Sequence, residues 1–209
     1  MQTENSPSGR KRSSFIERAR REQVIKAASE TVARVGYANT SLSRIAEQAG
    51  ISKSVISYHF AGKDELLVRV AKQFIEAAGE HMTSRVSVEP TASGQVRAWI
   101  SGQVEYFGAH RTGFLAMGDI ITNHRSPDGS RHFADSLDEE VGELSGILRR
   151  GQEEGEFREF DPRGTATIIL LSVDGLLTAW AMDPDVDLDN QLDTLLDFVH
   201  HAIRREDSP

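Results

Sequence analysis

Apolar residues recur at intervals of three and four along most of this chain, the spacing that places them on one face of an α-helix. The first such stripe runs from Ile25 through Ala28 and Val32 to Val35, and Gly36 follows where a helix commonly ends. No segment of useful length alternates between apolar and polar residues, as a half-buried strand would. The pattern therefore predicts an all-α chain of about nine helices.

Three further helices are expected in quick succession after the first stripe. A short one follows Thr40, which stands at its N-cap, and is closed by Gly50. Ser52 suits the N-cap of a third helix. Gly62 precedes a fourth, and Glu65 occupies the position at which a capping-box acid reaches back to the start of the helix.

Two helices near the C-terminus carry more apolar surface than a single stripe. Residues 165–181 are apolar nearly all round, and the final stripe runs over residues 188–203. Since a helix that is apolar on every side must be covered on every side, we expect a homodimer in which these two helices form a four-helix bundle with their two-fold copies. A core helix inside a monomer is the alternative. The predicted dimer interface comprises Ile168, Leu171, Leu176, Leu195, Val199 and Ile203.

The formal net charge of −8 is divided very unevenly along the chain. Residues 1–63 hold 11 Lys and Arg against 5 Asp and Glu, a net charge of +6, whereas residues 64–209 hold 13 against 27, a net charge of −14. A basic head on an acidic body suggests a polyanion as partner for the head alone. The alternative is an ordinary solvated surface.

The N-terminal residues and the absence of cysteine indicate where in the cell the protein is expected. Residues 1–14 are polar and lack the apolar stretch of a signal peptide, and the chain has no cysteine. Residues 165–182 are interrupted by an aspartate and are a poor membrane span. We therefore expect a cytoplasmic protein without a membrane partner. Residues 1–14 are predicted to form a disordered arm whose basic cluster is Arg10, Lys11 and Arg12.

The second and third predicted helices have the spacing of a helix-turn-helix. Such a motif needs a small residue where the helices meet, a turn residue that tolerates positive φ, and an apolar anchor on the second helix. Ala46, Gly50 and Ile56 supply these three at separations of four and six. A solvated helix face is the alternative, yet no acid lies between Gly50 and Lys63. The outward side chains, suited to groove edges and phosphates, would be Lys53, Ser54, Ser57 and Tyr58.

The segment YANTSLSRIAEQAGISKSVISYHFAGKDELL, residues 37–67, resembles the N-terminal domain of the TetR family of transcriptional regulators. The likeness runs without a gap from about Ala27 to Leu67. It implies a DNA-binding domain over residues 15–63 and a ligand-binding and dimerisation domain over residues 64–209. The implied function is that of a repressor that binds a palindromic operator as a homodimer and is released by a small molecule. A dimer would hold its two reading helices ~34 Å apart, one turn of DNA.

The resemblance also assigns contacts to individual positions of this chain. Two positions depart from the family pattern, because Ser57 replaces a frequent tyrosine and Ser43 replaces a frequent capping-box acid. The basic arm would follow the minor groove or the backbone. A satisfied, half-buried histidine is the alternative for His59. The implied DNA contacts are Thr40, Ser41, Lys53, Ser54, Ser57, Tyr58, His59 and Lys63.

The effector pocket is the least specified part of this expectation. In proteins of this kind the central helices surround a ligand cavity, whose polar groups orient the ligand. Plain core packing is the alternative for each aromatic residue, and the identity of the effector does not follow from the sequence. The candidate lining consists of Trp99, Tyr106, Phe107, His110, Phe114, Met117, Ile121, Asp174 and Trp180.

Enzymes and metal-binding proteins often carry short sequence motifs with fixed spacing. The sequence has no G-x-S-x-G, phosphate-binding loop or H-E-x-x-H motif, so we expect neither an enzyme nor a cofactor. The spacing of His124 and His132, and of His200 and His201, fits no metal-ligand pattern. Two other functions remain open: a DNA-binding protein of the same fold that organises DNA or activates genes, and a helical interaction module without a DNA role.

Overall fold

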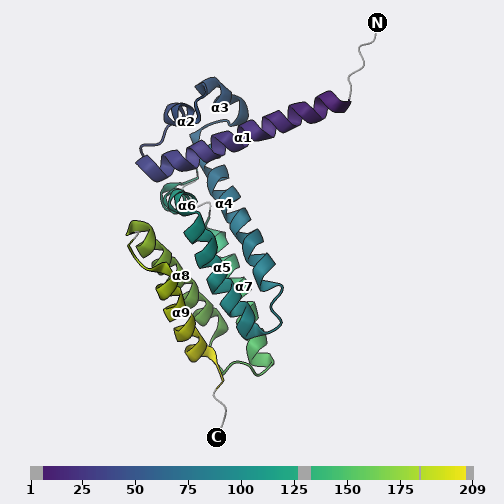
Figure 1. The fold of residues 1–209 in the computed structure, drawn as a ribbon, viewed down its shortest axis with the longest axis vertical. Coiled ribbons are helices and arrows are strands. Elements are labelled where there is room, and N and C mark those ends of the chain that lie inside the picture. Colours follow the sequence, from purple (N-terminus) through teal and green to yellow (C-terminus); the bar gives the residue numbers. More distant parts are fainter. Residues whose placement is uncertain (1–6, 127–132, 184, 206–209) are drawn as a thin grey trace. The chain divides into compact units, whose positions relative to one another are not determined.

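The computed structural model of the protein describes residues 7–126, 133–183 and 185–205. Within these ranges the chain forms nine α-helices, and its only extended pairing is an isolated bridge between Phe157 and Arg204. This arrangement confirms the predicted all-α fold (Figure 1).

The helices gather into two compact units. The first consists of Met1–Phe74 together with Thr112–His124, and the second of Ile75–Arg111 together with Arg125–Pro209. The sequence placed the boundary after residue 63. The structure places the first half of the fourth helix and nearly all of the sixth with the basic head.

The first unit is built around a small apolar core. It contains α1 (Pro7–Val35), α2 (Leu42–Ala49), α3 (Lys53–His59), the start of α4 (Lys63–Val86) and most of α6 (Arg111–Asn123). α2 packs against both α1 and α3. The core side chains include Val24, Ala28, Val32, Ile45, Ile56, Leu66 and Leu67.

α1 begins earlier than the sequence pattern predicted. Its first residue is Pro7, so the backbone of residues 7–14 is helical where a disordered arm was expected, and residues 1–6 lie outside the described ranges. Proline suits the first helical turn because it lacks only an N–H group that would have no partner in the helix.

The second unit is a bundle of long helices. The end of α4 is joined by α5 (Ala92–Ala109), α7 (Ala134–Glu153), α8 (Pro162–Met182) and α9 (Leu188–Ile203). α5 and α8 each pack against α7 and α9, and they also pack against each other. The core includes Trp99, Ile100, Leu144, Leu148, Val173 and Leu177.

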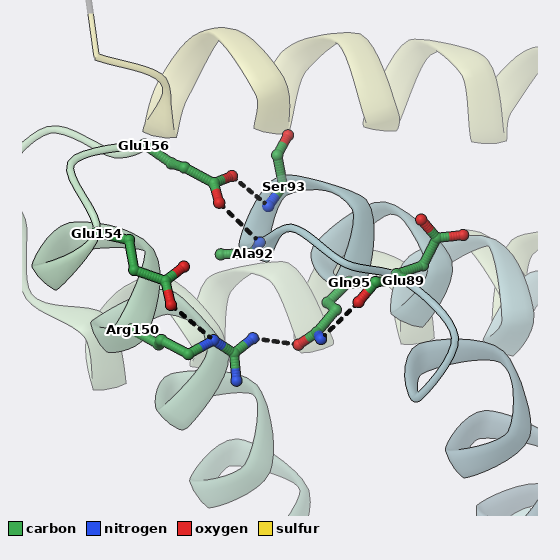
Figure 2. Close-up of polar contacts among 7 residues, drawn as sticks. All are labelled: Glu89, Ala92, Ser93, Gln95, Arg150, Glu154 and Glu156. Atoms are coloured by element: carbon green, nitrogen blue, oxygen red, sulfur yellow. Dashed lines mark hydrogen bonds and ion pairs between the residues drawn. The ribbon is translucent and has the colours of Figure 1, made fainter.

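A polar network ties the start of α5 to the end of α7 (Figure 2). The Glu156 carboxylate accepts the backbone N–H groups of Ala92 and Ser93 at 3.0 and 2.9 Å. Arg150 donates to the side chain of Gln95 and forms an ion pair with Glu154. An anion at a helix N-terminus satisfies free N–H groups and complements the helix dipole, so Glu156 fixes where α5 begins.

α8 turns one apolar face into the bundle and another to the surface. Asp161 caps its N-terminus by accepting two backbone N–H groups. Ile169 and Val173 are buried, whereas Ile168 and Leu171 are 62% and 56% exposed. α8 is the one helix in the described ranges long and apolar enough to cross a membrane, and 33% of its most apolar window is buried.

The predicted interface residues on α9 require a correction. Val199 and Ile203 are buried and line a small cleft together with residues of α5, so they are core residues of their own chain. Leu195 and Leu176 are half-buried. The large apolar side chain that α9 exposes is Phe198, at 64%. The periodic stripe marks the face turned inward, and the sequence interpretation assigned that face to the partner.

Candidate nucleic-acid interface

The predicted helix-turn-helix is confirmed in detail by the first unit. Ala46 and Ile56 are buried, the latter completely. Gly50 ends α2 with φ of 63°, the left-handed conformation that glycine adopts without strain. A β-carbon at Gly50 would meet no atom within 4 Å, so this position requires glycine for its backbone angle and not for space.

One face of α3 is exposed to solvent. Lys53, Ser54, Ser57 and Tyr58 are all exposed, Tyr58 by 75%. Ser52 stands at the N-cap, as predicted, but its hydroxyl bonds to that of Ser54 at 2.8 Å and caps no N–H group. We call Lys53, Ser54, Ser57 and Tyr58 the recognition face.

Side chains of α1 form hydrogen bonds with both helices of the motif. The Arg21 guanidinium donates to the backbone carbonyl of His59 at 3.0 Å and lies 4.4 Å from the centre of the Phe60 ring. The Gln23 side chain donates to the carbonyl of Ala49 at 2.8 Å. These bonds fix the C-termini of both α3 and α2. Sequence reasoning missed Arg21, because contacts across 38 residues leave no local pattern.

His59 lies between the recognition face and the core. Its side chain is half-buried, and its ring meets that of Tyr58 edge-on with 4.9 Å between the ring centres. A phosphate contact for His59 stays a prediction, since the ring is neither fully exposed nor enclosed.

The start of α2 differs from the prediction at Thr40. Ser41 is the N-cap of α2, and its hydroxyl accepts the N–H of Arg44 at 3.3 Å. Thr40 is buried, and its hydroxyl donates to the carbonyl of Gly36 at 2.8 Å, so this side chain is not presented to a phosphate. Ser41 remains exposed, and the exposed Arg44 adds a basic side chain that the sequence reasoning did not select.

Lys63 is engaged within the head. Its ammonium group donates to the backbone carbonyl of Tyr37 at 2.7 Å and lies 4.6 Å from the centre of the Tyr37 ring. Its side chain is half-buried. An ammonium group has three donors, so a phosphate contact remains available, but Lys63 also has a structural partner.

The predicted pocket residues are divided between the two units. Phe114, Met117 and Ile121 belong to the first unit, and Phe114 is buried there. The others belong to the second unit, where Asp174 is an exposed residue of α8. In the second unit Trp99 is buried, Tyr106, Phe107 and Trp180 are half-buried, and His110 is exposed.

Several aromatic side chains of the second unit contact one another. The rings of Tyr106 and His110 stack with centres 4.5 Å apart, and Phe107 meets Tyr106 edge-on at 5.7 Å. Burial, and then the nearby Glu80, raise the pKa of Tyr106. The Arg111 guanidinium lies 5.9 Å from the Trp180 ring.

Two clefts of the second unit are lined by other residues. One of about 360 Å³ lies between α4 and α5 and includes Arg85 and Arg97. The other, of about 50 Å³, lies between α5 and α9. The predicted pocket residues line neither of these two clefts.

Two protein families match this chain, one in its N-terminal part and one in its C-terminal part. Residues 24–70 match the family described as bacterial regulatory proteins, tetR family, and residues 123–204 match the BetI-type transcriptional repressor C-terminal family. The HTH-type transcriptional regulator BetI 1 of Chromohalobacter salexigens is 30% identical over 194 residues, which cover 90% of this chain and 93% of that protein.

Solved structures share the fold. The transcriptional regulator FadR of Bacillus subtilis, in complex with stearoyl-CoA, superimposes with a TM-score of 0.73 at 25% identity, covering 88% of this chain and 99% of that one. A Saccharomonospora viridis protein in complex with choline gives a TM-score of 0.79 at 23% identity, covering 89% and 98%.

Proposed function

We propose that this chain, which belongs to the TetR family of bacterial regulatory proteins, represses transcription by binding a palindromic operator as a homodimer and is released from it by a small molecule. Membership of the family makes it a DNA-binding transcriptional regulator with a ligand-responsive C-terminal part. The operator symmetry, the dimer and the chemical class of the effector are our proposals.

The observation that supports the proposed mode of DNA binding is the recognition face. Ile56 is fully buried beneath it, and Arg21 fixes the end of α3, so the face is rigid although it is exposed. Hydroxyl groups, a lysine and a phenol bond well to phosphates and base edges, and an α-helix fits the major groove. The absence of acids between Gly50 and Lys63 removes the repulsion that a surface helix usually carries.

The exposed apolar residues of α8 and α9 support the dimer. Ile168, Leu171 and Phe198 are each more than half exposed, although large apolar side chains are usually buried. We call these three residues the α8–α9 face. A two-fold dimer through this face would cover it and present two recognition faces to the two halves of a palindrome.

The acidic C-terminal part favours a cationic effector. Residues 64–209 carry a net charge of −14, which attracts cations and repels anions. The half-buried rings of Tyr106 and Phe107 are of the type that attracts quaternary ammonium groups. Among the molecules bound to the two similar structures, choline therefore suits this chain better than stearoyl-CoA.

The proposal is tested by selecting duplexes that bind the protein from a random pool. Choline and stearoyl-CoA are then tested separately for their ability to release the protein from the selected duplex. We expect a palindromic consensus, and we expect Ser54→Ala to change it at one base pair per half-site by ~1–3 kcal/mol. Ser43→Ala, an exposed serine of α2, is the matched control and should return the wild-type consensus.

Each part of the proposal has its own contrary result. If no duplex is enriched, this mode of DNA binding is wrong. A consensus without two-fold symmetry would contradict the dimeric operator. Release by stearoyl-CoA but not by choline would contradict the cationic effector.

A further inference from the structure

Tyr37 lies in the turn after α1, and three of its polar groups are bonded to other parts of the first unit. Its backbone N–H donates to Asp119 Oδ2 at 2.6 Å, and its phenol oxygen is 3.1 Å from His124 Nδ1. Its backbone carbonyl accepts the bond from Lys63. We call Tyr37, Lys63, Asp119 and His124 the Tyr37 latch.

The latch joins the head to α6 and to the residue after it. Asp119 belongs to α6, and the buried His124 follows its last residue. Asp119 also accepts from the side chain of Asn123 at 2.5 Å, which orients the carboxylate. A bond between a carboxylate and a backbone N–H is among the stronger hydrogen bonds in proteins, so α6 is held firmly to this turn.

α6 is also held against α4 within the same unit. A β-carbon at Gly113 would collide with the ring of Phe74, so this ring packs directly on the glycine. α6 therefore contacts the rest of the first unit at Gly113 and at Asp119, and its movement must change one of these contacts.

The geometry of α6 separates the latch from the predicted pocket residues. At about 100° per residue, Asp119 lies about 140–160° around the helix axis from Phe114, Met117 and Ile121. One face of α6 thus carries three pocket candidates, and the opposite face carries the carboxylate that holds Tyr37.

The Tyr37 latch also includes, or lies next to, residues that are predicted to contact DNA. Lys63 is one of the predicted phosphate contacts and touches both the carbonyl and the ring of Tyr37. On the other side, Gly36 precedes Tyr37, and its carbonyl accepts the hydroxyl of Thr40, next to the N-cap of α2. Tyr37 is therefore bonded or adjacent to the starts of α2 and α4 and to the end of α6.

We infer that Tyr37 and Asp119 are positioning residues that couple DNA binding by the head to the conformation of α6. The inference rests on the proposed mode of DNA binding. DNA that engages Lys63 and Ser41 favours the arrangement in which the latch is closed, and the closed latch holds α6. Because such coupling is reciprocal, a ligand that moves α6 opens the latch and weakens DNA binding.

Reciprocity allows the coupling to be tested without the effector. Hydrogen exchange is measured by mass spectrometry with and without the duplex that the wild-type chain selects from a random pool. We expect the duplex to slow exchange in residues 40–63, and to slow it about five-fold or more in residues 112–124, the lower end of usual allosteric coupling.

Variants separate a coupling role from a merely structural one. Asp119→Ala removes the acceptor of the Tyr37 N–H, so the duplex should still protect residues 40–63 but leave residues 112–124 unchanged. Asp119→Asn keeps an acceptor oxygen and should restore the effect. Thr112→Ala, an exposed residue of the same helix, is the matched control and should behave as wild type.

Tyr37→Phe provides a second test if Asp119→Ala does not fold. It removes the phenol oxygen that lies 3.1 Å from His124 Nδ1 and should reduce the protection of residues 112–124 about two-fold or more.

The possible results are distinct. If the duplex protects residues 40–63 of the wild type but does not slow hydrogen exchange in residues 112–124, the inference is overturned. It is also overturned if the duplex slows exchange in residues 112–124 of Asp119→Ala as much as in the wild type. Where Asp119→Ala does not fold, the same result in Tyr37→Phe overturns it. If the chain selects no duplex, the proposed mode of DNA binding fails and the inference fails with it.

Discussion

Glu140 of α7 illustrates how a single side chain affects the stability of the second unit. Burial, and then the neighbouring carboxylates of Glu143 and Asp174, raise the pKa of Glu140 to about 7. Burial also raises the pKa of Asp174. An acid with a raised pKa in the folded state holds its proton more tightly when the chain is folded, so its contribution to stability is present at low pH and is lost as pH rises through about 7.

We therefore predict that the free energy of unfolding falls between pH 5 and pH 8, and that Glu140→Gln flattens this dependence. At about 1.4 kcal/mol per pKa unit, the variant should gain at most about 3 kcal/mol at pH 8. Urea unfolding at a fixed protein concentration measures this. Glu139→Gln, an exposed neighbour, is the matched control, and equal pH slopes for Glu140→Gln and wild type would contradict the prediction.

At the residue scale, the sequence-based predictions were confirmed for residues that can serve only one structural purpose. Gly50 and Ile56 are required by geometry, and the spacing identified both. Thr40 and Lys63 have side chains that suit either DNA or the protein, and the structure bonds both to backbone carbonyls of the head. The sequence alone does not choose between two such partners, because the choice depends on which backbone groups lie nearby in the fold.

At the scale of elements, α8 and α9 show what apolar periodicity can establish. The period correctly indicated helices and identified residues that share a face. It did not indicate what each face contacts, so Val199 and Ile203 were assigned to a partner, although they are buried in their own chain. Phe198 is exposed and was not selected, because it lies off the periodic stripe.

We predict that the α8–α9 face holds the dimer together. Leu171→Glu and Phe198→Glu place charges in an apolar contact, and each should raise the dissociation constant of the dimer about 30-fold or more, as loss of a central contact residue usually does. Sedimentation velocity over a range of concentrations measures this. Val88→Glu, at a position 75% exposed outside this face, is the matched control. Dimers of unchanged stability in both face variants would exclude this surface.

At the scale of the whole molecule, positive charge is concentrated in the DNA-binding part of the chain and negative charge in the C-terminal part. Residues 1–63 carry +6 and the remainder −14, so only the head attracts DNA, and the acidic part repels it. The sequence was sufficient to predict the nine helices that the described residues form, the helix-turn-helix and this charge asymmetry. It was insufficient for the grouping of α6 with the head, because the apolar stripe of α6 resembles those of the helices in the other unit.

The salt dependence of binding to the selected duplex, compared between wild type and Lys53→Ala, tests the central claim that the recognition face enters DNA. Each phosphate contact contributes about −0.9 to the slope of log K against log salt concentration. We predict that Lys53→Ala makes the slope shallower by about one per subunit, whereas Lys72→Ala, which removes the same charge from an exposed site on α4, leaves it unchanged. Parallel lines for wild type and both variants, or wild-type binding that is insensitive to salt, would contradict the account.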